Sequence, residues 1–214
     1  RAGVAREVAT LITQTLVDPA DPALAAPSKP VGHPLTDDQA ARMRAAGDAI
    51  GRDGAGRWRR LARSPRPLGV VEAPLVRRLA GEGVIVIAAG GGGPPVYADA
   101  ERGLEGVDAV VDKDLVAAML ATQLGAEVLM ILTDVDAVYE GWGTPASRPL
   151  SRLTLSQAEA LLGGGTLPAG SMRPKVEGAA EFVRASGGRA VIARLSDGPA
   201  ALRGETGTTI VREP

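Results

Sequence analysis

Residues 84–95 read VIVIAAGGGGPP, an unbroken apolar run that leads into glycines and two prolines. An apolar run without polar alternation is typical of a strand that is buried on both faces of a parallel sheet. We therefore predict a strand over Val84–Ala89. The glycines that follow it are Gly90, Gly91, Gly92 and Gly93. In open α/β sheets ligands bind at the carboxyl ends of strands, and glycines there let the backbone approach a small anion closely.

A flexible turn is the alternative interpretation of the same glycines. The run is not a P-loop, because no lysine followed by Ser or Thr comes after it. It is not a G-x-G-x-x-G motif either, because Pro95 stands where the last glycine would be.

Strands and helices alternate on both sides of this run, which predicts an α/β fold with three layers, α/β/α, around an open, mainly parallel sheet. Apolar runs and turn residues place the strands, and capping residues place the helices, with Gly125 closing one of them. The strands are expected over 70–72, 127–132, 190–194 and 208–211, and the helices over 74–81, 112–124, 154–162, 171–186 and 199–203.

The amino-terminal third differs in amino-acid composition from the rest of the chain. Residues 8–17 are rich in β-branched side chains and predict one strand, which Asp18 and a proline end. From there to residue 67 prolines and arginines dominate, around a helix over 36–48 with Thr36 as its N-cap. We predict a main core from residues 1–17 and 68–214 and a small protruding subdomain from residues 18–67.

Composition excludes several classes of protein. The chain has 214 residues and a net charge of −1, with 24 Lys and Arg against 25 Asp and Glu, so a nucleic-acid partner is not expected. It has no cysteine, which rules out disulfides and thiolate metal sites in this chain and agrees with a cytoplasmic location. Its longest apolar runs are far too short to cross a bilayer, so no membrane association is expected.

Three further stretches carry candidate site residues. Asp112 and Asp114 begin a predicted helix and read as ordinary caps, but Lys113 between them opposes the helix dipole, a conflict that a bound phosphate would relieve. Gly170, Ser171 and Met172 lead into another helix, whose free amide groups together with Lys175 would bind an anion, the alternative being a surface lysine. Thr133, Asp134 and Val135 end a buried strand, where a carboxylate can bind a ribose or adenine edge and Tyr139 can offer a ring, although an ordinary turn also uses aspartates.

Taken together and in order, these stretches resemble the carbamate kinases of the amino-acid kinase family. The resemblance covers essentially the whole chain. The Asp-Lys-Asp of residues 112–114, the Lys-Pro-Val-Gly of residues 29–32 and the Thr-Asp-Val-Asp-Ala-Val-Tyr of residues 133–139 favour carbamate kinases over acetylglutamate, aspartate or uridylate kinases. It also includes residues 90–93, 104–115, 168–172 and 174–177.

The resemblance implies phosphoryl transfer between ADP and carbamoyl phosphate, which forms ATP and carbamate reversibly. Lys113 and Lys175 would contact the phosphates, and Asp114 would hold these lysines. The protruding subdomain of residues 18–67 would be a lid on a kinase core, and Lys29 would meet the transferred group from this lid. Gly90 to Gly93 would lie near carbamate, while Asp134 and Tyr139 would line the nucleotide pocket. Further binding residues would be Asp112, Thr133, Val135, Gly170, Ser171 and Met172. Mg²⁺ would bridge the phosphates without a dedicated protein metal site.

The chain also departs from the family. It lacks the Gly-Gly-Asn loop that holds the small substrate in carbamate kinases, so we expect an amino-terminal segment to be absent before Arg1. A homodimer and a place in arginine metabolism follow from family analogy. Two alternatives stay open: a catalytically incomplete nucleotide-binding fragment, and a related kinase that acts on another small acid. The central prediction is that Lys113 and Lys175 converge on one triphosphate.

Overall fold

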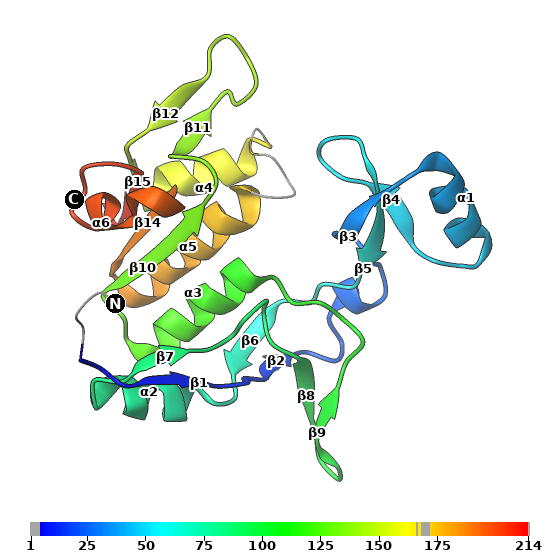
Figure 1. Cartoon of the computed structure of the whole chain (residues 1–214), viewed down its shortest axis with the longest axis horizontal. Helices are drawn as coiled ribbons and strands as arrows, with labels where there is room; N and C mark the ends of the chain where they lie inside the picture. Colours follow the sequence, from blue (N-terminus) through cyan, green and yellow to red (C-terminus); the bar gives the residue numbers. More distant parts are fainter. Residues whose placement is uncertain (1–4, 166, 168–171, 214) are drawn as a thin grey trace. The chain divides into compact units, whose positions relative to one another are not determined.

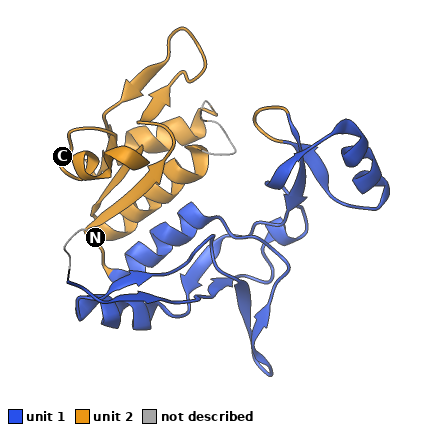
Figure 2. Ribbon diagram, viewed as in Figure 1, with its two compact units in different colours: residues 1–52, 57–124 blue, residues 53–56, 125–214 orange. Residues whose placement is uncertain are grey.

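The computed structural model describes residues 5–165, 167 and 172–213. These residues form two compact units, which are described separately (Figure 2). Unit 1 comprises residues 1–52 and 57–124, and unit 2 comprises residues 53–56 and 125–214. Strands and helices alternate along both units, in agreement with the predicted α/β class.

Unit 1 is built around a four-stranded sheet of mixed direction, in the order β6-β2-β8-β9 (Figure 1). The strand β2 pairs in parallel with β8 and antiparallel with β6, and β8 forms an antiparallel hairpin with β9. Their bounds are β2 Thr15–Val17, β6 Pro67–Val70, β8 Pro95–Asp99 and β9 Gly103–Gly106. The pairing is thus mixed where a mainly parallel sheet was expected, because local hairpins add antiparallel strands.

The single strand predicted over residues 8–17 is two strands, β1 (Val8–Thr10) and β2. Leu11 still donates its N–H to the Ile87 carbonyl at 2.9 Å, but Thr13 lies against the glycine turn and ends the ladder. The Thr13 hydroxyl accepts a hydrogen bond from the Ala89 N–H at 2.9 Å. The prediction was wrong here because β-branched composition does not register a break that a distant turn imposes.

The apolar run at residues 84–89 forms only a short strand, β7 (Ile85–Ile87), which pairs in parallel with β1. Ile85 and Ile87 are 43% and 53% exposed. The expectation of a strand buried on both faces was therefore wrong. Among the described residues, β1 is the only strand that pairs with β7, and one face of this pair stays open.

The helices α2 (Ala73–Gly81) and α3 (Lys113–Leu124) contribute to the core of unit 1. Their buried side chains meet those of β2 and β6 in one apolar cluster, made of Val17, Val70, Ala73, Val111 and Val116. Gly125, at φ +69°, ends α3 as predicted. This cluster fixes the start of α3 relative to the sheet, which matters for the candidate site.

A separate three-stranded antiparallel sheet, in the order β3-β5-β4, lies within the predicted lid segment. Its elements are β3 Lys29–Leu35, β4 Ile50–Arg52, β5 Trp58–Ala62 and the helix α1 Asp37–Ala45, after a short 3₁₀ turn, η1 Pro22–Leu24. Thr36 caps α1 as predicted, in a capping box with Gln39. The guanidinium groups of Arg44 and Arg52 each lie 4.0 Å from the centre of the Trp58 ring. Only the helix of this group was foreseen from the sequence.

Unit 2 holds a four-stranded sheet in the order β10-β14-β15-β13. The strand bounds are β10 Val128–Thr133, β13 Arg152–Thr154, β14 Arg189–Arg194 and β15 Thr208–Val211, with a hairpin of β11 Val138–Glu140 and β12 Arg148–Leu150. Its helices are α4 Leu155–Gly163, α5 Met172–Ser186 and α6 Gly198–Leu202, the last after a 3₁₀ turn, η2 Leu195–Asp197. Strands 127–132, 190–194 and 208–211 were predicted, whereas the hairpin and β13 were not.

Both faces of β14 are covered in unit 2 (Figure 1). Val191 and Ala193 pack with Ala201 of α6 in one apolar cluster. The alternate residues Ala190 and Ile192 face the other side of the sheet, where α5 packs on β14. The four side chains of β14, at residues 190–193, are fully buried. This unit therefore has the predicted α/β/α layering.

Candidate active site

The glycine turn after β7 is held tightly in unit 1. A Cβ on Gly92 would lie 2.6 Å from the Val111 carbonyl oxygen, and one on Gly93 would lie 2.5 Å from the Thr13 carbonyl oxygen. Both residues have positive φ, so a side chain fits neither the space nor the backbone. The N–H groups of Gly90 and Gly92 donate to Ala88 and Ala89 inside the turn. These two N–H groups are therefore engaged within the turn and do not point to a ligand. What the turn offers is a backbone without side chains, which lets other groups come close to it.

The start of α3 lies against this turn, since the same Cβ on Gly92 would be 3.7 Å from the backbone nitrogen of Lys113. Asp112 caps the helix: its Oδ1 accepts hydrogen bonds from the N–H groups of Asp114 at 2.9 Å and Leu115 at 3.4 Å. Its Oδ2 accepts a hydrogen bond from the Lys29 ammonium. Lys113 pairs with the Asp114 carboxylate at 3.2 Å.

Two opposing effects act on the Asp112 carboxyl. Burial raises its pKa, whereas the hydrogen bond and charge of Lys29, with the N–H groups of Asp114 and Leu115, lower it. The net pKa lies below the ordinary value of 3.8, so the group is an anion at neutral pH. Asp112, predicted to touch nucleotide or substrate, has two local partners here, a helix start and a lysine.

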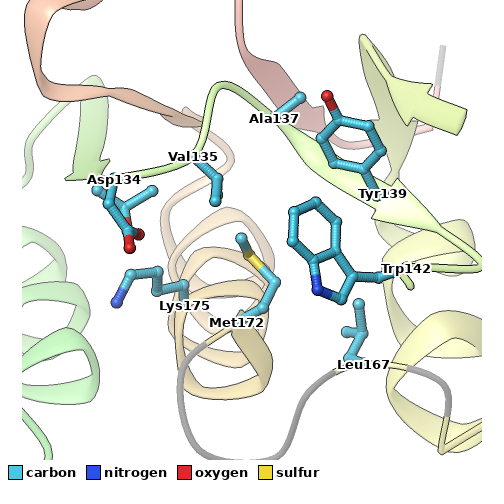
Figure 3. Close-up of a pocket in the computed structure, with 9 residues that line it drawn as sticks. Asp134, Val135, Ala137, Tyr139, Trp142, Leu167, Met172 and Lys175 are labelled. Carbon is cyan, nitrogen blue, oxygen red and sulfur yellow. The ribbon is translucent and has the colours of Figure 1, made fainter. Parts of the chain in front are cut away.

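A pocket of about 200 Å³ opens in unit 2 beyond the carboxyl end of β10. It is lined by Thr133, Asp134, Val135, Ala137, Tyr139, Trp142, Leu167, Met172 and Lys175. Figure 3 shows two ends: Asp134 and the Lys175 ammonium lie at one, and the Tyr139 and Trp142 rings at the other, with Met172 between them. Lys175 projects from the first turn of α5 and is only 8% exposed. The pocket therefore offers an apolar aromatic wall beside a charged end.

The aromatic wall has its own support. Tyr139 and Trp142 meet edge to face, with ring centres 5.0 Å apart. The Tyr139 hydroxyl donates to both oxygens of Asp136, at 3.1 and 3.2 Å, which raises the pKa of Tyr139. Arg194 lies 3.9 Å from the same carboxylate. Asp136 thus orients the ring that the sequence singled out.

Comparison with known proteins decides the family. The family model described as "Amino acid kinase family" matches residues 25–194. The chain belongs to the amino acid kinase family. The resemblance predicted from the sequence is confirmed, and so is the fold class.

Relatives of this amino acid kinase bear the name carbamate kinase. The carbamate kinase of Thermococcus kodakarensis is 45% identical over 100% of this chain and 68% of its own length. A structure of the Giardia lamblia carbamate kinase bound to citric acid is 41% identical, with a TM-score of 0.89, over 97% of this chain and 65% of that one. A second Giardia lamblia structure, bound to AMP-PNP, is 40% identical, with a TM-score of 0.83, over 97% and 66%. The chain thus spans about two thirds of the length of these relatives.

The predicted site residues of this amino acid kinase fall into two groups. Unit 1 holds Lys29, Gly90, Gly91, Gly92, Gly93, Asp112, Lys113 and Asp114, and unit 2 holds Thr133, Asp134, Val135, Tyr139, Met172 and Lys175. Within each unit, the residues of the group lie near one another. Gly170 and Ser171 lie outside the described residues. Convergence of Lys113 and Lys175 on one ligand stays a prediction, because the two lysines belong to different units.

Lysine usage in this amino acid kinase provides a signal that sequence inspection overlooked. The chain has 24 basic residues, of which only Lys29, Lys113 and Lys175 are lysines. Arginine and lysine are not interchangeable where a compact ammonium must meet an oxyanion, so this usage favours the three lysines as candidate site residues. Trp142 was missed too. It lies in the β11–β12 hairpin, and only the fold brings it to the pocket.

No group of three or more His, Cys, Asp or Glu side chains that could hold a metal ion occurs in the described part of the chain. Over the same residues, no helix is both long and apolar enough to span a bilayer.

Proposed function

We propose that this amino acid kinase acts as a carbamate kinase, which transfers a phosphoryl group between carbamoyl phosphate and ADP to form carbamate and ATP reversibly. The observation that carries the proposal is the pocket beyond β10, which combines an aromatic wall with a nearly buried lysine. The identity of 40–45% to proteins named carbamate kinase supports the choice of small substrate.

The nucleotide would bind with its base against the aromatic wall. Trp142 is half exposed, so its ring can accept a second ring on its open side. Met172 and Val135, which line the same pocket, would contact the base, and Asp134 would bind the ribose hydroxyls. A relative crystallised with AMP-PNP supports a nucleotide in this class of protein.

Lysines would supply the charge at the reacting end. Phosphoryl transfer leaves little covalent chemistry to the protein, which mainly positions the reactants in line and neutralises the phosphate oxygens. Lys175 and Lys113 would contact the nucleotide phosphates, Asp114 would hold Lys113, and Lys29 would meet the transferred group. Carbamate already carries an anionic oxygen, so no general base is required.

Mg²⁺ fits this proposal as a partner of the phosphates. The described residues offer no cluster of acidic side chains for a protein-held ion, so Mg²⁺ would keep most of its ligands from phosphates and water. When bound it would neutralise phosphate charge. Asp134 is the carboxylate that lines the pocket and could reach such an ion through water.

A homodimer, a cytoplasmic location and a place in arginine metabolism complete the proposal. They rest on family analogy alone. Size-exclusion chromatography with light scattering would test the first of them directly.

The deciding experiment measures ATP formed from carbamoyl phosphate and ADP with Mg²⁺. The chain should form ATP, while acetylglutamyl phosphate and aspartyl phosphate should not replace carbamoyl phosphate. Lys175→Met keeps the length of the side chain but removes its charge, and should lower kcat by about 100-fold or more. Arg203→Met, an exposed change in unit 2 outside the pocket, is the matched control and should leave kcat unchanged. A fall of less than tenfold for Lys175→Met would reject its assigned role.

A second candidate function is nucleotide binding without catalysis. The specific observation in its favour is that the pocket by itself offers an aromatic wall and Lys175, while Lys29 and Lys113 belong to unit 1. In that case ADP should quench Trp142 fluorescence while no ATP forms. Binding together with turnover would reject this candidate.

A further inference from the structure

Lys29 and Asp112 form an ion pair across 83 positions of the sequence. Lys29 is the first residue of β3, and Asp112 directly precedes α3. Their side chains are 26% and 13% exposed. A pair that is partly withdrawn from water is screened less than a surface pair and has a more defined geometry.

Neighbouring backbone contacts explain why these two residues meet. The Val110 N–H donates to the Arg63 carbonyl, just after β5, at 2.9 Å, and the Ser28 N–H donates to the Ala62 carbonyl at 3.0 Å. Lys29 lies opposite Ala62 in the β3–β5 register. The chain that enters α3 therefore runs along the ends of β3 and β5, which brings Asp112 to Lys29.

The two oxygens of Asp112 have different partners. Oδ1 accepts from the N–H groups of Asp114 and Leu115, whereas Oδ2 accepts from Lys29. If Lys29 moves to another anion, the carboxylate still holds two backbone donors. Departure of the lysine therefore does not leave a buried charge without hydrogen bonds, which is the costly outcome.

We propose that Asp112 is a positioning residue: it holds the Lys29 ammonium beside the glycine turn and the α3 start, and yields it to the phosphoryl group in transfer. This role rests on the proposed function. A phosphoryl group carries more charge than a carboxylate and competes well for an ammonium. Asp112 would thus fix where Lys29 waits without itself touching the substrate.

Kinetics of a conservative variant test the catalytic part. Asp112→Asn keeps the oxygen that caps α3, because Asn is as good an N-cap as Asp, but presents an amide donor to the Lys29 ammonium. We expect kcat to fall by about tenfold or more, with KM for ADP unchanged. Lys29→Met should lower kcat at least as far, and kcat of the double variant should be no lower than that of Lys29→Met alone. If the two losses multiply, Asp112 acts independently of Lys29 and the proposal is overturned.

Amine labelling tests the contact without any need for activity. Lys29, Lys113 and Lys175 are the only lysines of the chain, so an acylating reagent with mass-spectrometric readout reports on each one, and the other two serve as internal references. In Asp112→Asn, acylation of Lys29 should rise several-fold while Lys113 and Lys175 keep their rates. An unchanged rate at Lys29 overturns the positioning role, even in an active kinase. If the unsubstituted chain forms no ATP, the proposed function fails separately, and labelling still decides whether Asp112 holds Lys29.

Discussion

Strands β7 and β14 are both apolar, yet β7 is largely exposed and β14 is buried. In unit 2, Val191, Ile192 and Ala193 of β14 are 0% exposed, whereas in unit 1 Ile85 and Ile87 of β7 are 43% and 53% exposed. β14 has β10 on one side, β15 on the other and helices on both faces, while the described partner of β7 is β1 alone. An apolar run thus specifies a strand, but its burial depends on what the rest of the fold places around it.

The largest expected difference is in stability. Ile192→Ala should lower the free energy of unfolding of unit 2 by about 2–5 kcal/mol, since it leaves a cavity in a closed core. Ile87→Ala, the matched change in β7, should cost unit 1 less than about 1 kcal/mol, since little buried area is lost. Trp142 lies in unit 2 and Trp58 in unit 1, so urea unfolding of single-tryptophan variants follows each unit separately. Equal losses in both units would contradict the comparison.

The next effect concerns the glycine turn that follows β7 in unit 1, where backbone segments approach one another closely. Gly93→Ala should destabilise unit 1 by about 1–3 kcal/mol, because it strains a positive φ and clashes with the Thr13 carbonyl. Gly91→Ala, two residues away, adds its methyl group to open space and should leave stability within about 1 kcal/mol of its starting value. Trp58 fluorescence in urea measures both. Similar losses for the two variants would show that the turn tolerates side chains uniformly.

A smaller effect should appear in dye binding. Replacing Ile85 and Ile87 by Thr keeps the β-branched shape but removes the exposed apolar surface of β7. ANS fluorescence of the folded chain should fall, while unfolding of unit 1 shifts by less than about 1 kcal/mol. Unchanged ANS binding would mean that this face is covered in solution.

The smallest expected effect is a pH dependence confined to unit 1. The pKa of Asp112 is lowered in the folded chain, so its pair with Lys29 stabilises at pH values above 3.8 and this stabilisation is lost as the pH falls below that value. Lys29 faces Asp112 from β3, while Lys113 and Asp114 neighbour it on α3. The free energy of unfolding of unit 1 should therefore be higher in the unsubstituted chain than in Asp112→Asn at pH 7. The two values should converge in acid. A difference that does not shrink as the pH falls below 3.8 would reject the ionic contribution of this pair.

Signals that act within a few residues were predicted well. Thr36 and Thr154 begin helices with capping boxes, and Gly125 ends one, because a cap is satisfied by backbone groups next to it. The strands β3 to β5 and the hairpins were not predicted, since short strands with many prolines, arginines and glycines carry little periodicity. Trp142 was missed for the same reason, as its role depends on a hairpin.

By itself the sequence determined the α/β class, the family and the positions of all three lysines, because these are written in local patterns and in motif order. The tertiary structure alone decided that β7 stays open while β14 is enclosed, that Asp112 holds Lys29, and that Trp142 joins Tyr139 at one pocket. Each of these outcomes depends on residues far apart in the chain. Their meeting is set by strand pairing and packing, which no local stretch of residues encodes.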